Sequence, residues 1–291
     1  MNDQSEIASS GESAAVYCAN LVRERDFQRY AVTLFVPEDK RRALLALFAF
    51  NVEIVRIRDH ITQPLPGEMR LQWWSDMIAG TQSSNAEGNP VASELMRAIA
   101  AHDLPREKLL QMIEAHIFDV YNDPMPTLDA LEVYCHDTSS ILFSLSARIF
   151  SGESPEADHV ARHAGIAQGI SDVIACLPVH AARGQLFLPH TMLAENGVNE
   201  SDIFAGIMTP ALHEVIERLR AEGVSHLDSA GELLASVPEG AQPAFLRLAL
   251  IRRSLTHVTP ANADAFKPPS SSRLAILWTL WKASRSQLFR S

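Results

Sequence analysis

Long apolar runs are missing from this 291-residue chain. No stretch of about 18 consecutive apolar residues occurs, so we expect no membrane-spanning helix. Cysteine is also scarce: Cys18, Cys135 and Cys176 lie far apart and form no CxxC pair. This odd and scattered set favours a reducing compartment and argues against a disulfide framework.

Signals for export and for nucleic-acid binding are lacking too. The first residues, MNDQSEIASSGES, contain neither the basic and apolar regions of a secretory signal nor the arginines of a transit peptide. The formal net charge is −10, whereas sequence-blind binding to phosphates needs a basic surface. We therefore expect a cytoplasmic protein without a nucleic-acid partner. Contact with the surface of the inner membrane stays open.

Helical periodicity runs through the chain, and alternating β-branched runs are nearly absent, which predicts an all-α fold. Ser13 is placed to cap a first helix, Pro37 to open a second, and Gly80 to end a third. We expect a flexible segment over residues 1–12 and one domain over 13–291. The predicted helices span about 13–26, 38–60, 67–80, 90–102, 105–121, 127–150, 155–177, 209–236, 239–258 and 271–289.

Charged side chains interrupt the second predicted helix in AFNVEIVRIRD, residues 49–59. Glu53 and Arg56 are three residues apart, as are Arg56 and Asp59, so each pair can form an ion pair on a helix. One interpretation is a salt-bridged stripe at a helix edge. The other is the mouth of a polar site, to which Asn51 would also contribute.

Asp172, Cys176 and His180 follow one another at intervals of four residues. Carboxylate, thiolate and imidazole groups all ligate metals, and such spacing on a helix can present them to one zinc ion. Against this, Pro178 removes a helical hydrogen bond and is expected to bend the chain before His180. A buried cysteine and a neutral histidine near a helix end explain the same residues.

Aromatic residues gather in RLQWW, residues 70–74. Trp73 and Trp74 project about 100° apart, and core packing is the more common role for such a pair. Gln72 would then face a cavity. No GxGxxG, P-loop, HExxH or GxSxG motif occurs. In AGIAQGI, Gly165 and Gly169 predict close packing of helices.

Taken together and in order, five segments resemble the squalene/phytoene synthase family: LFAFNVEIVRIRD, RLQWW, VYCHDTSS, AGIAQGISDVI and ARGQLFLP. The resemblance implies an isoprenoid synthase-type helical bundle around a central cavity. Active members join two prenyl diphosphates head to head. Two facing helices each carry a D-x-x-x-D motif whose carboxylates hold magnesium ions, and these hold the diphosphate.

By this resemblance the first motif falls on Val55 to Asp59, which reads V-x-x-x-D, and the second on Cys176 to His180, which reads C-x-x-x-H. Valine cannot ligate magnesium, and cysteine and histidine match a hard cation poorly. Asp59 and Asp172 are the weak metal candidates, and Glu53 could add an oxygen. No metal and no catalytic residue is therefore expected.

The resemblance also places two family arginines on Ala175 and Gln185, while Arg183 is retained nearby. The clamp for a diphosphate would thus lack cationic groups as well as metal ligands. The candidates for lining the cavity or binding a ligand are Asn51, Glu53, Arg56, Asp59, Gln72, Trp73, Gln168, Asp172, Cys176, His180 and Arg183.

A closer resemblance is to the mitochondrial complex I assembly factor 6 group and its bacterial relatives, carried by segments such as RDFQRYAVTLFVPEDKRRALLALFAF, MRLQWWSDMIAG and PAFLRLAL. It implies a non-catalytic assembly or binding factor, with subunits of the respiratory complex as partners and no cofactor. Two alternatives remain open. One is an active prenyltransferase that uses magnesium at an altered site, and the other is an isoprenoid-lipid carrier.

Overall fold

The computed structural model describes residues 2–80, 88–256, 265–267 and 272–286, with side chains from Ser13 onward. Helices and no strands occur in these ranges, which confirms the all-α prediction. The α-helices are α1 (Asn2–Arg25), α2 (Phe27–Thr33), α3 (Glu38–Val55), α4 (Pro64–Ala79), α5 (Pro90–His102), α6 (Arg106–Ala115), α7 (Ile117–Val120), α8 (Leu128–Cys135), α9 (Ile141–Ser151), α10 (Pro155–Ala175), α11 (Leu177–Ala182), α12 (His190–Glu195), α13 (Glu200–Phe204), α14 (Pro210–Leu233), α15 (Leu248–Thr256) and α16 (Arg273–Ser284).

Four shorter helical segments connect these helices: η1 (Arg56–His60), η3 (Leu234–Ser236) and η4 (Glu239–Phe245) are 3-10 helices, and η2 (His136–Ser140) is a π-helix. Several predicted ends are confirmed. Gly80 ends α4 at φ 82°, a left-handed conformation that suits glycine. The hydroxyl of Thr127 accepts a hydrogen bond from the Ala130 amide at 3.1 Å and so caps α8.

One predicted bound is wrong, and four predicted helices keep their approximate bounds but are not continuous α-helices. The first helix begins at Asn2, so Ser13 lies inside α1 and does not cap it. The second leaves α-geometry at Val55 and continues as the tighter η1. The segment 105–121 breaks at His116, the segment 127–150 contains the π-helix η2, and the segment 239–258 starts as a 3-10 helix that contains Pro243. These breaks depend on tertiary packing, which hydrophobic periodicity does not record.

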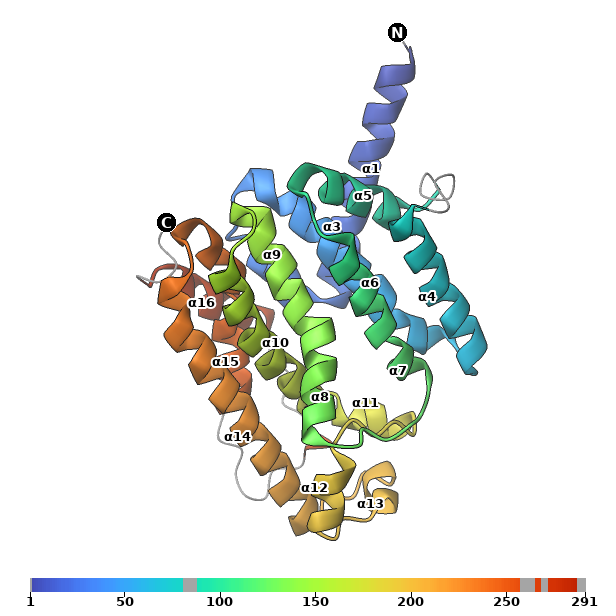
Figure 1. Ribbon diagram of the computed structural model, residues 1–291, viewed down its shortest axis with the longest axis vertical. Coiled ribbons are helices and arrows are strands. Elements are labelled where there is room, and N and C mark those ends of the chain that lie inside the picture. Colours follow the sequence, from blue (N-terminus) through green and yellow to red (C-terminus); the bar gives the residue numbers. More distant parts are fainter. Residues whose placement is uncertain (1, 81–87, 257–264, 268–271, 287–291) are drawn as a thin grey trace.

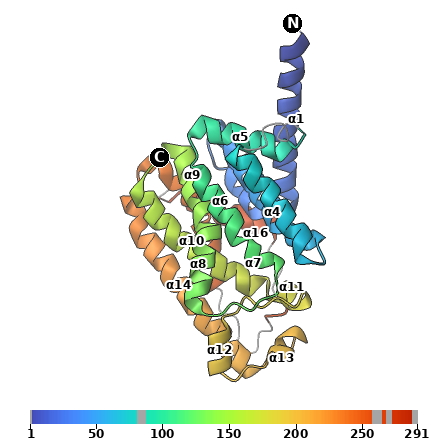
Figure 2. The same cartoon turned by 45° about the vertical axis from the view of Figure 1, so that its right-hand side comes forward.

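The helices form two groups that meet along α3 and α9 (Figure 1). In one group α1, α3 and α5 pack together, and α4 lies against α6. In the other, α10 is packed between α9 and α14. Helices α12 and α13 lie at the end of the molecule opposite α5, as both views show (Figures 1 and 2).

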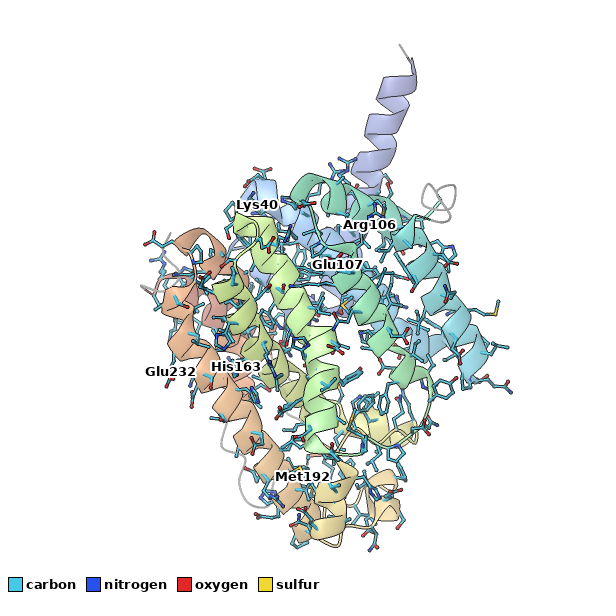
Figure 3. The ribbon with its side chains drawn as sticks, in the orientation of Figure 1. Lys40, Arg106, Glu107, His163, Met192 and Glu232 are labelled. Carbon is cyan, nitrogen blue, oxygen red and sulfur yellow. The ribbon has the colours of Figure 1, made fainter. Side chains whose placement is uncertain are left out.

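Two glycines allow α10 to approach its neighbours closely, as their spacing predicts. A Cβ atom on Gly165 would lie 2.2 Å from the backbone nitrogen of Ser140, and one on Gly169 would lie 2.3 Å from the Cys135 Sγ. On another side of α10, His163 faces α14, where its Nδ1 lies 2.9 Å from Nδ1 of His226 (Figure 3). No helix among the described residues is long and apolar enough to cross a bilayer.

Candidate functional site

A cavity of about 460 Å³ opens where helices from both groups converge. Its walls come from the start of α2, the end of α3 with η1, the α6–α7 junction, α8 with η2, and the junction of α10 with α11. Five arginines and four aspartates line it, together with apolar side chains such as Val173 and Phe187. It is therefore an amphipathic pocket with many charged groups.

Seven of the predicted site residues line this cavity: Asn51, Arg56, Asp59, Asp172, Cys176, His180 and Arg183. Glu53 and Trp73 instead line a neighbouring pocket of about 290 Å³, to which Arg56 also contributes. Gln168 is buried and bonded to Asp172, which lines the cavity. Gln72 lines neither pocket and donates to Asp76 on its own helix at 2.8 Å.

Of the two ion pairs that spacing predicts at the end of α3, the Glu53–Arg56 pair is confirmed and the Arg56–Asp59 pair is wrong. Arg56 lies 3.9 Å from the Glu53 carboxylate and 3.1 Å from the ring nitrogen of His60. Asp59 pairs with Arg183 from the far side of the cavity, at 2.7 Å. In the 3-10 helix η1, residues three apart still lie above one another, so the geometry of η1 does not prevent an Arg56–Asp59 pair. Each residue instead has another partner, His60 for Arg56 and Arg183 for Asp59. The Asp59–Arg183 pair instead bridges two walls.

A chain of hydrogen-bonded and ion-paired groups extends inward from Asp172, which is itself exposed in the cavity, to the buried side chains of Gln168, Arg247 and Arg29. The Asp172 carboxylate accepts from the Gln168 side-chain amide at 2.7 Å, and the Gln168 carbonyl oxygen accepts from Arg247 Nε at 2.5 Å. The Arg247 guanidinium lies 3.7 Å from Asp26, which also accepts from Arg29 Nη1 at 2.5 Å. We call these five residues the buried charge network. It ties α10 to α2 and to the start of α15.

Burial and charge act in opposite directions on the two aspartates of the network. Burial raises the pKa of Asp172, and Arg247 offsets only part of that rise. Burial also disfavours the charged form of Asp26, but Arg29 and Arg247 together bring the pKa of that carboxyl below its ordinary value. Asp26 is therefore the anionic centre of the network, and the proton affinity of Asp172 is increased.

The opposite wall is organised around Asp119, which the sequence analysis did not single out. Its carboxylate accepts from the Tyr134 hydroxyl at 2.7 Å and lies 2.6 Å from His116 Nδ1. Its backbone carbonyl accepts from the Gln185 side-chain amide at 3.1 Å. Burial, with the adjacent Asp119 charge, holds the pKa of Tyr134 well above its usual range. Tyr134 therefore donates to Asp119 as a neutral phenol.

Three buried polar atoms of cavity-lining residues have no hydrogen-bond partner within the described part of the protein: Arg58 Nε, His116 Nε2 and Gln185 Oε1. Buried polar atoms in native proteins are almost always paired, with protein groups or with water. These atoms belong to residues of the cavity wall but are themselves buried, so they do not offer hydrogen bonds to a ligand in the cavity as it stands.

The Asp172, Cys176 and His180 line does not form one helical face. Helix α10 ends at Ala175, and Pro178 lies in the first turn of the separate helix α11, so the predicted bend is present. Burial raises the pKa of the Cys176 thiol to about 11 and lowers the pKa of His180 to about 4. No three His, Cys, Asp or Glu side chains in the described ranges are arranged to hold a metal ion.

Several site residues were missed by the sequence analysis, and only some of them left a signal. Arg247 stands alone among apolar residues in PAFLRLAL, and a lone charge in a buried run indicates a buried partner. Asp26 follows directly after the charged end of α1 and caps α2. Asp119 and His116 carry no such signal, because they are brought to the cavity by the break between α6 and α7.

Comparisons with known proteins agree with this architecture. A squalene synthase from Alicyclobacillus acidocaldarius superposes with a TM-score of 0.73 over 84% of this chain and 92% of its own, at 21% identity. The fold is therefore that of an isoprenoid synthase-type helical bundle. The squalene/phytoene synthase family model matches residues 22–282, and the chain belongs to this family.

Two relatives within the family carry different names. NADH dehydrogenase (ubiquinone) complex I, assembly factor 6 of Rattus norvegicus is 30% identical over 90% of this chain and 79% of its own length. Presqualene diphosphate synthase of Sinorhizobium fredii is 24% identical over 70% of this chain and 72% of its own. Family membership alone therefore does not choose between assembly and catalysis.

Proposed function

We propose that this protein is a non-catalytic member of its family that acts as an assembly or binding factor for respiratory complex I. It would work in the cytoplasm, at the periphery of the inner membrane, with subunits of that complex as partners. The observation that carries the proposal is the set of side chains at the four motif positions. Val55, Asp59, Cys176 and His180 all line the cavity, and only one of them is a carboxylate.

The chemistry of these four side chains argues against a magnesium–diphosphate site. Valine offers no ligand, the Cys176 thiol stays protonated at neutral pH with its raised pKa, and His180 is a neutral nitrogen donor. Asp59 already pairs with Arg183. Hard cations need several oxygen ligands that converge on one point. This donor set does not fit a magnesium cluster, and we derive no step through one.

The buried charge network supports the same proposal. Asp172 lies one turn before the second motif position, and it could serve as a magnesium ligand only as an available anion. One of its oxygens accepts from Gln168 within the network, and desolvation raises its pKa while Arg247 and Gln168 lower it. A single carboxylate at this position supplies too few oxygen ligands for a magnesium cluster. The similarity to assembly factor 6 proteins over most of both chains adds a reason to propose complex I as the target.

The alternative of an active head-to-head prenyltransferase has one observation in its favour, a cavity of about 460 Å³ lined by five arginines. It would need Glu53, Asp59 and Asp172 as magnesium ligands. Glu53, however, lines the neighbouring pocket, so the three carboxylates do not share one cavity. An isoprenoid-lipid carrier is favoured by the apolar side chains of the cavity wall, such as Val173 and Phe187. It predicts a lipid that co-purifies without magnesium.

Calorimetry with a non-hydrolysable farnesyl diphosphate analogue tests the site directly. We expect no magnesium-dependent heat of binding and no condensation of farnesyl or geranylgeranyl diphosphate. The matched control carries Val55→Asp, Cys176→Asp and His180→Asp, which restores both motifs, and should gain magnesium-dependent binding if it stays folded by circular dichroism. Tight magnesium-dependent binding by the unaltered protein would favour the enzyme.

Deletion of the gene in its own cells tests the biological target. The amount of assembled complex I, read as NADH:ubiquinone oxidoreductase activity of the membranes, should fall and should return when the unaltered gene is restored. The Asp59→Ala variant should restore it equally well. Unchanged complex I in the deletion strain would refute the assembly role, whatever the calorimetry shows.

A further inference from the structure

Helix α16 has apolar side chains on its outer face as well as on its inner one. Ile276 and Leu280 are buried against α2 and α15. On the outside, Leu274 is 77% exposed, Trp278 55% and Trp281 38%. An amphipathic surface helix would carry polar residues there. Because α16 has 12 residues, it is also too short to cross a bilayer.

The exposed residues form one continuous strip. Leu274, Trp278, Trp281 and Arg285 are spaced by four, three and four residues, which places them on one side of a helix. The two indole rings stack with centroids 5.0 Å apart. Lys282 lies 5.0 Å from the Trp278 ring centroid, and the Arg285 guanidinium lies 4.3 Å from that of Trp281. We call this strip, with Lys282, the tryptophan face.

Charge is distributed unevenly between this end of the chain and the rest. All 35 acidic residues lie within the first 264 positions, whereas residues 265–291 contain five basic residues and no acidic one. The protein as a whole is therefore acidic, and its tryptophan face is basic. A partner that attracts this face must be anionic, and it must also accept exposed indole rings.

We propose that the tryptophan face of α16 docks on the surface of a membrane that contains anionic phospholipid. Indole rings favour the interface between headgroups and acyl chains, since one edge of the ring is polar and the rest is apolar. Basic side chains beside them are attracted by anionic headgroups. A helix that is apolar outside, basic along its flank and too short to span a bilayer suits binding parallel to the surface.

This docking would place the cavity close to the lipid surface. The start of α2 connects α16 with the cavity. The Arg273 guanidinium of α16 lies 4.6 Å from the ring centroid of Phe27, the first residue of α2. Asp26, which precedes Phe27, lines the cavity. The inference assigns a surface to the membrane contact that the proposed function includes, and its test does not depend on the assembly role, because it concerns only that surface and a bilayer.

Sedimentation with lipid vesicles tests the proposal on the full chain. We expect binding to vesicles of phosphatidylcholine with 30% phosphatidylglycerol and much weaker binding to phosphatidylcholine alone. The Trp278→Ala/Trp281→Ala variant should bind at least about tenfold more weakly, because it loses most of the apolar area available for insertion. The Lys282→Gln/Arg285→Gln variant should lose about fivefold in affinity for the anionic vesicles for each charge removed at low salt. This loss of affinity should shrink in 1 M salt.

A matched control uses another exposed apolar pair. Leu65 and Met69 are 65% and 66% exposed on α4, four residues apart, and lie beside both acidic and basic residues. Leu65→Ser/Met69→Ser should leave vesicle binding unchanged. Equal losses in both double variants, or no binding of the unaltered protein to anionic vesicles, would overturn the proposal.

A second measurement needs no substitution. The chain contains four tryptophans, of which Trp74 is buried and Trp73 partly buried in the α4 region. Vesicles with brominated acyl chains should quench the fluorescence of Trp278 and Trp281 on binding. Absence of quenching would contradict insertion. A different result would also contradict the proposal. If light scattering without lipid showed a dimer, and the Trp278→Ala/Trp281→Ala variant were a monomer, the tryptophan face would be an interface between two copies.

Discussion

The two halves of α10 are built on different principles. In the packing half, residues 155–165, the inward side chains are alanines and a valine, at most 2% exposed, within an apolar cluster that includes parts of α9 and α14. In the cavity half, residues 168–175, Gln168 and Asp172 belong to the buried charge network. The first half is held by close contact of small residues, and the second half combines apolar contacts of Ile170 and Val173 with compensating charges.

This contrast shows two ways in which one helix is held in the fold. Apolar packing in the first half depends on shape alone. Beside the second half, the largely buried charges of Arg247 and Asp26 would be costly if they were left alone. Here Arg247 and Arg29 supply the positive charge close to Asp26. Protein cations thus compensate a buried anion beside the cavity, and the same scaffold is kept.

The largest effect should come from removing the central cation of the cavity half. Arg247→Met leaves Gln168 Oε1 without its donor and Asp26 with one arginine fewer. We expect a loss of about 3 to 5 kcal/mol in the free energy of unfolding, as for other broken buried ion pairs. Urea denaturation measures it. Arg252→Met, at a half-exposed arginine paired with Asp228, is the control and should cost less than about 1 kcal/mol.

The packing half should respond to volume and not to charge. Gly165→Ala places a methyl group 2.2 Å from the backbone of Ser140, which cannot move aside as a flexible side chain would. We expect destabilisation by about 2 to 3 kcal/mol, again by urea denaturation. Gly231→Ala in α14, where the nearest atom is 3.9 Å away, should be neutral or stabilising. Equal effects at both glycines would argue against the contrast.

The packing half is also the part that the sequence predicts best. Helical periodicity and Gly165 record local geometry and close approach, and both appear in the structure as expected, as does the close approach at Gly169 in the cavity half. The family resemblance indicated the cavity and the α10–α11 region that lines it. These features depend on residues near one another in the chain, or on a known order of segments.

The cavity half and its opposite wall were predicted less completely. The Arg247 contact with Gln168 joins residues 79 positions apart, and Asp59 meets Arg183 across the cavity. Spacing instead suggested the local pair of Asp59 with Arg56, but Asp59 takes the long-range partner Arg183, which spacing along one helix does not show. Asp119 reaches the cavity through a helix break at His116 that periodicity does not show. Long-range charge pairing and irregular backbone therefore set the limit.

A smaller, pH-dependent effect should distinguish the cavity from the packed core. Burial lowers the pKa of His180 to about 4 from an ordinary value near 6.5. The unfolded chain therefore binds a proton before the folded one does, and stability present above pH 6.5 is lost as the pH falls toward 4. Between pH 7 and pH 5 this loss should be about 2 kcal/mol.

The His180→Gln variant removes this titration. Its free energy of unfolding, measured by urea denaturation at each pH, should fall less between pH 7 and pH 5 than that of the unaltered protein. The pKa of His163 is also lowered by burial and by its histidine neighbours. Because that group titrates in both proteins, the difference between the two curves isolates His180. Parallel curves would show that His180 is not buried as a neutral ring.

The smallest effect is expected at the cavity mouth, where Asp59 and Arg183 are each more than a third exposed. Solvent screens such pairs, so Asp59→Asn should change stability by less than about 1 kcal/mol. A double-mutant cycle with Arg183→Gln measures the coupling energy between the two side chains.

The same substitution separates the proposed function from its enzyme alternative. In an active prenyltransferase, Asp59→Asn should abolish turnover while stability changes little, because Asp59 is the only carboxylate left at the four motif positions. A variant with unchanged stability that no longer supports complex I assembly would show that this residue contacts a ligand or partner. A variant that behaves like the unaltered protein in both assays would leave Asp59 as a bridge between two walls of the cavity.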